Sequence, residues 1–387
     1  MQTMLKYSVG TDLSKETFDA CFSVIDSQQK VTIKSTRKFD NTISGIKNFI
    51  GWSKKLRKHD IPIVFTMEAT GIYYERLALA LYEEEFYVSV VLPNKAKKYM
   101  QSIGQKSKND KIDAKGLSRM GAEQQLACWM PFSRNIYQLR LLTRQNEDLQ
   151  QQRTILINRK EAHRFCQDQN EIIDNQLGTM LNLVEQQLKQ INNAIIRVIE
   201  EDTLLKEKIF RISKIKGLGI LTVATVVAET NGFYLFKNQR QLVSYAGYDI
   251  IENQSGNRKG KTKISKKGNS HIRRVLHMPA FNVVRYEQGS FKNLYDRVYM
   301  RTNKKMKAYV AVQRKLLMLI YTLWNNNTEF DSNYHKSSGN DEPKFLFSLG
   351  FEKAVKKVVP VKNTRTTQDE LPCNESPEVL FSLIQNY

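Results

Sequence analysis

The chain has no proline between Pro131 and Pro279, and its only glycine from 135 to 209 is Gly178. Proline and glycine are the residues that most strongly interrupt helices, so this stretch can form helices longer than those of an ordinary globular domain. We therefore expect a helical region over 131–210 that separates an N-terminal part of the chain from a C-terminal part.

The second half of this helical region carries a regular apolar pattern. Apolar residues alternate spacings of four and three at Leu177, Leu181, Val184, Leu188, Ile191, Ile195 and Val198. The first half is less regular, because Asn146, Arg153 and Lys160 fall on the same register. An apolar seam of this kind is typical of a coiled coil. It predicts an antiparallel helical hairpin or a coiled coil that pairs two subunits, and a helix packed on its own domain is the remaining alternative.

The N-terminal part predicts an α/β domain over 1–130. Short runs rich in β-branched and aromatic residues indicate strands, and two intervening stretches have helical spacing. The expected strands are 7–12, 17–24, 31–39, 61–67 and 87–92, and the expected helices are 42–56 and 72–84. Three strands in close succession, followed by strand, helix and strand, favour a mixed sheet covered by helices.

The charge of the chain points to a polyanionic partner. The chain has 60 Lys and Arg residues and 39 Asp and Glu residues, which gives a formal net charge of +21. A surplus of this size repels itself unless a polyanion binds it, and nucleic acid is the commonest such partner. The N-terminus does not have the pattern of a signal peptide, and no apolar run reaches 18 residues. We expect an intracellular, cytoplasmic protein that binds nucleic acid and does not bind a membrane.

Four carboxylates stand out against this positive charge. Asp12 and Glu68 each follow an apolar strand, and Asp110 and Asp113 are spaced i and i+3, on one face of a helix. Several acidic oxygens at one place are the ligands that Mg²⁺ prefers, and two such ions can promote displacement at phosphorus. Taken singly, each acid could instead be a turn residue, a charge at a helix N-terminus or a helix cap.

The C-terminal part, 211–330, is predicted to be mainly helical and to bind phosphate. Lys216, Gly217 and Gly219 suit a tight turn that presents backbone N–H groups, as in helix-hairpin-helix elements, although a plain turn between helices fits equally. A basic run without acids follows Ser255: Arg258, Lys259, Lys261, Lys263, Lys266, Lys267, Arg273 and Arg274. Its glycines favour a folded phosphate-binding loop over a solvated face. The proline-rich remainder, 331–387, is expected to be a loosely ordered extension.

Two sets of motifs carry a resemblance to one family. The strand Asp12, the strand Glu68 in Met67-Glu68-Ala69-Thr70-Gly71, and the Lys-x-Asp-x-x-Asp-Ala element that begins at Lys108 form the first set. The second set is Gly217-Leu218-Gly219, Leu242-Val243-Ser244-Tyr245-Ala246-Gly247, Gln254-Ser255-Gly256 and Lys267-Gly268-Asn269-x-x-Ile272-Arg273-Arg274. Together they resemble the bacterial insertion-sequence transposases of the DEDD family related to the Piv DNA invertase. The resemblance covers about residues 5 to 325, and one departure is Asn109, where that family more often has a small hydroxyl residue.

The resemblance implies a fold and a chemistry. It implies an RNase H-like, RuvC-like N-terminal domain in which Asp12, Glu68, Asp110 and Asp113 bind two Mg²⁺ ions, for which Mn²⁺ could substitute. Ser255 would be the nucleophile that joins transiently to a DNA phosphate. A bridge RNA encoded by the element would pair with target and donor DNA, and Lys108 with the C-terminal basic residues would contact nucleic acid. The resemblance also implies a homo-oligomer, a dimer that forms a tetramer on DNA, active at the bacterial nucleoid.

Other functions remain open at this point. A metal-dependent nuclease of the Holliday-junction type would need the four acids but not Ser255. A non-catalytic binder would use the basic region alone, and the acids would then be accidental.

Overall fold

The structure is a computed structural model that describes residues 3–69, 71–105, 107, 109–252, 254–255, 258–260, 262–286 and 289–331, with backbone only at 254, 255, 258 and 259. The predictions made for Lys108, Lys261 and the extension after residue 331 lie outside these ranges. The chain forms two compact units, one ending at Pro131 and one beginning at Phe132. The division into four domains stays a prediction.

The N-terminal unit is built on a mixed sheet of five strands in the order β3-β2-β1-β4-β5. Its strands are β1 Met4–Leu13, β2 Thr17–Asp26, β3 Val31–Asp40, β4 Ile63–Glu68 and β5 Tyr87–Val91. Its helices are α1 Ile43–Leu56, α2 Glu75–Glu83, α3 Pro93–Ser102 and α4 Asp110–Glu123. The first three strands pair antiparallel, whereas β4 pairs parallel with both β1 and β5.

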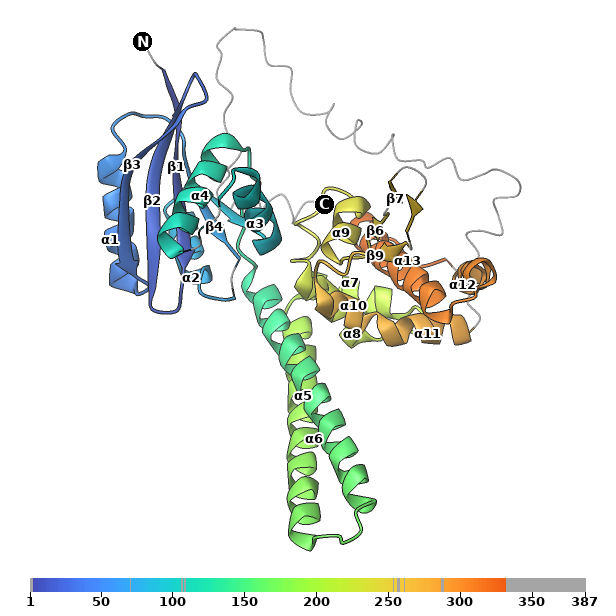
Figure 1. The fold of residues 1–387 in the computed structure, drawn as a ribbon. Coiled ribbons are helices and arrows are strands. Elements are labelled where there is room, and N and C mark those ends of the chain that lie inside the picture. The colour runs from blue at the N-terminus through green and yellow to red at the C-terminus, as the bar shows by residue number, and fades with distance from the viewer. Residues whose placement is uncertain are drawn as a thin grey trace, which may run out of the picture. The chain divides into compact units, whose positions relative to one another are not determined.

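The two faces of this sheet differ in chemistry. One face carries an aromatic core in which Phe18, Phe22 and Phe65 pack with Phe49 and Trp52 of α1. The other face carries small and polar side chains, and α4 packs across β1, β2 and β4 there (Figure 1). We refer to it as the α4 face. Because side chains alternate along a strand, each strand contributes to both faces.

The C-terminal unit is mostly helical, as predicted. Its helices are α5 Arg134–Arg164, α6 Glu171–Glu200, α7 Thr203–Ser213, α8 Ile220–Glu229, α9 Gln239–Tyr245, α10 Ser270–Val275, α11 His277–Arg285, α12 Gly289–Thr302 and α13 Lys305–Asn326. Two short antiparallel pairs, β6 Ile250–Ile251 with β9 Lys263–Ile264 and β7 Gln254–Ser255 with β8 Arg258–Lys259, lie between α9 and α10. Helix α8 is the centre of the core, since every residue from Thr222 to Glu229 is buried.

The prediction of a mixed α/β N-terminal part and a mainly helical C-terminal part is therefore confirmed. No helix among the described residues combines the length and the apolar character needed to cross a lipid bilayer.

The long helices α5 and α6 lie side by side and run in opposite directions (Figure 1). Val184 and Leu188 of the apolar seam pack against Leu149 of α5. The polar residues that interrupt the register in α5 also find partners on α6. Asn146 donates to Asn192 at 2.8 Å and Arg153 donates to Glu185 at 3.1 Å.

This packing changes what the apolar seam means. Val184 and Leu188 are each less than one tenth exposed within a single chain, so the seam needs no second subunit to bury them. It is no longer an argument for pairing two subunits, and the homo-oligomer stays a prediction.

We expect Leu188→Ala to destabilise the folded chain by about 3 kcal/mol, because truncating a buried leucine leaves a cavity. Leu183→Ala on the same helix is the matched control, since Leu183 is 54% exposed, and it should change the free energy of unfolding by less than about 0.5 kcal/mol. Chemical denaturation of both variants measures the difference. Equal destabilisation of the two variants would contradict the packing of the seam against α5.

Candidate active site

Asp12 and Glu68 are brought to the same edge of the sheet by the pairing of β1 with β4. These strands are parallel, and Thr11 pairs with Met67, so Asp12 and Glu68 are the next residues on adjacent strands. Met67 lies in the aromatic core on the opposite face. By alternation, Asp12 and Glu68 both belong to the α4 face.

Helix α4 is held very close to β1 by two glycines. A Cβ atom built on Gly10 would lie 2.1 Å from the backbone nitrogen of Ser118 and 2.3 Å from the carbonyl oxygen of Ala114. A Cβ atom on Gly121 would lie 2.5 Å from the hydroxyl oxygen of Ser8. The helix therefore runs antiparallel to β1, and its first turn lies beside the end of β1 where Asp12 is found.

The start of α4 is fixed by Asn109, the residue at which the sequence departs from the family it resembles. Its side-chain oxygen accepts a hydrogen bond from the backbone nitrogen of Ile112 at 2.8 Å. Asparagine is among the best helix caps, so it performs the capping role that a small hydroxyl residue would perform. The cap places Asp110 and Asp113 in the first turn of α4.

The backbone thus places all four predicted acids at one corner of the N-terminal unit. Within the described ranges, however, no three His, Cys, Asp or Glu side chains converge closely enough to hold a metal ion. The donor set fits a hard divalent cation, because it consists of carboxylate oxygens. The side chains would have to turn toward one another to share an ion.

One acid at this corner was not predicted from the sequence. Asp19 of β2 is the direct cross-strand partner of Asp12. Its neighbours Phe18 and Ala20 lie in the aromatic core, so Asp19 points to the α4 face like Asp12. The signal that could have revealed it is the short turn between β1 and β2, which sets the register of the hairpin.

Gly10→Ala should separate α4 from β1, because its Cβ atom would meet backbone atoms that cannot move aside. We expect a decrease of about 3 kcal/mol in the free energy of unfolding, as for other overpacked sites. Gly51→Ala in α1 is the control, since a Cβ there meets nothing within 4 Å and alanine favours a helix by up to about 1 kcal/mol. Thermal denaturation of both proteins tests this, and a Gly10→Ala protein as stable as wild type would contradict the close approach.

In the C-terminal unit, Ser255 lies on a very short hairpin. It pairs with Arg258 across the two strands β7 and β8, and Gln254 pairs with Lys259. The side chains of these four residues lie outside the described part of the structure. The role of Ser255 as a nucleophile stays a prediction.

The turn at Gly217 connects α7 with α8. Gly217 has φ +96°, a backbone conformation that favours glycine. A Cβ atom on it would also lie 3.0 Å from the Cβ of Asn282, which leaves little room for a side chain. Gly219 is the residue immediately before α8. The amino group of Lys216 lies 4.7 Å from the centre of the Tyr286 ring. Contact of these residues with nucleic acid stays a prediction.

The residues of the basic run are used in different ways. Lys263, Lys266 and Lys267 are exposed. By contrast, Arg273 donates to the carbonyl oxygens of Ala246 at 2.8 Å and Asn269 at 3.1 Å. It therefore has a structural role in addition to any contact with a ligand.

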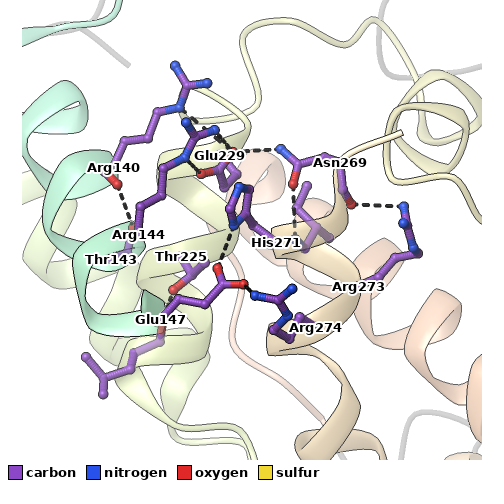
Figure 2. A network of polar contacts seen from close by, with 12 residues as sticks. Arg140, Thr143, Arg144, Glu147, Thr225, Glu229, Asn269, His271, Arg273 and Arg274 are labelled. Atoms are coloured by element: carbon purple, nitrogen blue, oxygen red, sulfur yellow. Dashed lines mark hydrogen bonds and ion pairs between the residues drawn. The ribbon is translucent and has the colours of Figure 1, made fainter. Parts of the chain in front are cut away.

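Arg274 is likewise engaged inside the unit. It forms an ion pair with Glu147 of α5, whose other carboxylate oxygen lies 2.5 Å from Nδ1 of His271 (Figure 2). Burial lowers the pKa of His271 below its ordinary value, so at neutral pH the ring is uncharged and donates its Nδ1–H to the carboxylate.

A buried carboxylate holds this unit together at the start of α10 (Figure 2). The side chain of Glu229 is fully buried, and Arg144 of α5 donates two hydrogen bonds to it, at 2.6 and 3.0 Å. Asn269, which lies within the basic run and caps α10, donates to the same carboxylate at 2.7 Å. Arg140 lies 3.8 Å away. The network thus ties α5, α8 and the start of α10 together.

The charge of Glu229 is set by two opposing effects. Burial by itself raises the pKa of its carboxyl group, but the hydrogen bonds and charge of Arg144, with Asn269 and Arg140, outweigh burial and lower it. Glu229 is therefore ionised at neutral pH. The buried, ionised state of Glu229 was not predicted from the sequence. The one signal for it is that Glu229 is the single acid of α8 and stands at the end of a largely apolar helix.

Glu229→Gln should cost about 3 kcal/mol of stability at neutral pH, because Arg144 loses its buried counter-charge. The lowered pKa makes the contribution of Glu229 complete above its ordinary value of 4.5 and progressively smaller as the pH falls below it. The stability difference between wild type and variant should therefore shrink in acid. Urea denaturation at several pH values measures this.

Glu185→Gln is the control for this prediction. Glu185 forms an ion pair with Arg153 in which both side chains are more than 40% exposed, and such pairs contribute less than about 1 kcal/mol. A difference for Glu229→Gln that stays constant down to acid pH would contradict the ionised, buried carboxylate.

Comparison with known proteins gives matches over both units. A family model described as transposase matches residues 9–163, and a model described as transposase of the IS116/IS110/IS902 family matches residues 210–296. The pilin gene-inverting proteins of Moraxella bovis and Moraxella lacunata are each 28% identical over 334 residues, which is 86% of this chain and all of each relative. The transposase for insertion sequence element IS1111A of Coxiella burnetii (strain RSA 493 / Nine Mile phase I) is 24% identical over 259 residues, 60% of this chain and 70% of that protein.

Proposed function

Because this chain belongs to the IS110 family of transposases, we propose that it cuts and rejoins DNA by transient attachment to Ser255. In this proposal Asp12, Glu68, Asp110 and Asp113 hold divalent metal, Mg²⁺ by preference. The observation that carries the proposal is the arrangement of the acids: two on adjacent parallel strands and two in the first turn of the helix packed over them.

The architecture of the N-terminal unit supports an RNase H-like fold. Three antiparallel strands followed by two parallel strands, in the order β3-β2-β1-β4-β5, give the sheet that such a fold requires. Helix α4 crosses the face on which the acids stand.

Each acid would contribute oxygen ligands from a rigid element. Asp12 and Glu68 are fixed by the ladder between β1 and β4, and Asp113 is fixed because the next residue, Ala114, packs on Gly10. A pair of divalent ions supplies charge that activates an attacking oxygen and stabilises a leaving oxygen at phosphorus. The protein's own contribution is to hold the carboxylates at one corner.

The covalent step would exchange one phosphodiester bond for another. The hydroxyl oxygen of Ser255 forms a bond to phosphorus, the bond from phosphorus to a deoxyribose oxygen breaks, and the hydroxyl proton is lost to a base or to solvent while the leaving oxygen gains a proton. No bond energy is lost to water. The reverse attack by a DNA hydroxyl then releases Ser255 and rejoins the strand without ATP.

Positive charge in the C-terminal unit supports contact with nucleic acid. Lys263, Lys266 and Lys267 lie close in sequence to Ser255 and are exposed, so a phosphate backbone could approach them. We propose that target and donor DNA are selected by a bridge RNA through base pairing. The protein would then recognise backbone and shape, as in other RNA-guided systems. A homo-oligomer would allow two DNA sites to be joined in one complex.

A covalent protein–DNA adduct is the expected mark of this mechanism. With a nicked DNA substrate that prevents rejoining, wild-type protein with Mg²⁺ or Mn²⁺ should give an adduct that resists denaturant, and peptide mapping should place the linkage on Ser255. The adduct should be absent with Ser255→Ala, with Asp12→Ala and in EDTA, because both the hydroxyl and the metal ligands are needed.

Ser244→Ala and Ser270→Ala are the control variants, because both serines lie near Ser255 in sequence and should not form the linkage. An adduct mapped to one of them would move the nucleophile. DNA cleaved to free 3′-hydroxyl and 5′-phosphate ends, with no adduct and with Ser255→Ala fully active, would show that water attacks. The chain would then act as a metal-dependent nuclease of the Holliday-junction type.

A further inference from the structure

A second group of positive residues follows the basic run in the sequence. From Arg297 to Lys315 the chain contains no Asp or Glu. Six of its basic residues are exposed: Arg297, Arg301, Lys304, Lys305, Lys307 and Arg314. None of them forms an ion pair with any residue of the described part of the chain. The preceding acid, Asp296, is engaged with Lys292 at 3.3 Å. We call five of these residues, Arg297, Arg301, Lys304, Lys305 and Lys307, the α12–α13 corner.

The geometry of two helices gathers these charges. Helix α12 ends at Thr302 and α13 begins at Lys305, and Asn303 between them adopts a left-handed conformation with φ +49°. The two helices pack against each other (Figure 1). The last turn of α12, with Arg301, and the first turn of α13, with Lys305, therefore meet at one end of the pair.

The backbone adds to the positive potential of this corner. The residue before α13, Lys304, makes no capping hydrogen bond with its side chain, and the first turn of α13 contains no acid. The first backbone N–H groups of a 22-residue helix thus point outward without a side-chain acceptor, at the positive end of the helix dipole. Such a helix start, beside several lysines and arginines, attracts a phosphate.

The corner is rigid because aromatic rings pack beneath it. Tyr309 of α13 stacks on Phe281 of α11 with ring centres 3.7 Å apart, and it lies 4.6 Å from the ring of Tyr295 in α12. Tyr295 is only 8% exposed. Tyr309 therefore packs against rings of both α11 and α12, which fixes the start of α13 relative to α12.

We propose that the α12–α13 corner binds the phosphodiester backbone of a nucleic-acid duplex, independently of its sequence. The inference rests on the proposed function only in that the substrate is nucleic acid. It adds basic residues of α12 and α13 to those of the basic run between Arg258 and Arg274. Its role is to hold the duplex in place, and it takes no part in the reaction at Ser255.

The test compares two variants of the full chain that each remove four positive charges. The first is Arg297→Gln, Arg301→Gln, Lys304→Gln and Lys305→Gln combined. The matched control combines Arg159→Gln, Lys189→Gln, Arg197→Gln and Lys237→Gln, at exposed positions of the same unit but away from the corner. Fluorescence anisotropy with random-sequence duplex DNA and duplex RNA, in EDTA and over a range of salt concentrations, gives the affinity and its salt dependence.

The corner variant should bind more weakly, and the slope of log K against log salt should flatten by about 0.9 for each phosphate of duplex DNA that the variant no longer neutralises. The control should keep the slope of the wild type. A change with DNA alone or with RNA alone supports the proposal and identifies the duplex. Equal slopes for both variants and the wild type would show that the corner is a solvated surface and overturn it.

The failure of this inference can be told apart from failure of the proposed function. Binding in EDTA does not require metal, so the anisotropy measurement reports on the corner without any reaction at Ser255. If no adduct forms but the corner variant still flattens the salt slope, only the proposed reaction at Ser255 is contradicted. If the adduct forms but the corner variant keeps the wild-type slope, only the proposed binding surface is contradicted.

Discussion

The approach of α4 to the backbone of β1 at Gly10 is the interaction on which the candidate catalytic corner depends. Any side chain at Gly10 would meet the backbone of Ala114 and Ser118. The helix can therefore approach the strand this closely only where the strand has a glycine. The hydroxyl of Ser118 then reaches the carbonyl oxygen of Ser8 at 2.9 Å. A helix so constrained cannot slide along the strand. Its first turn, which carries two acids, is thereby held at the strand ends that carry the other two.

The C-terminal unit depends on an interaction of a different kind. Glu229 is an ionised group inside an apolar core, and such a group is tolerated only because Arg144 and Asn269 satisfy its oxygens. An apolar substitute could be equally stable, but it would not specify where Asn269 lies. Because Asn269 lies within the basic run and caps α10, the buried carboxylate fixes the position of this part of the run.

The positive charge of the chain is divided between internal and external roles. Arg144 neutralises a buried acid, and Arg273 supports the backbone of a turn, so these residues add little to the outer surface. Lys266 and Lys267, and the lysines at the start of α13, have no such internal task among the described residues. A formal charge of +21 therefore overstates the number of groups that can face a nucleic acid, and the surfaces that do so are local.

The sequence by itself determined the local structure: strands from short runs of β-branched and aromatic residues, long helices from the absence of proline and the near absence of glycine, and acids at strand ends from an apolar run followed by Asp12 or Glu68. It also identified the motifs of the family. Only the tertiary structure decided that the α6 seam is buried by α5 and that Asp19 faces Asp12. The same holds for Glu229, which meets an arginine 85 residues away along the chain. Local patterns arise from steric and apolar preferences within a few residues, whereas these pairings depend on which distant segments pack together, and no short window of sequence contains that information.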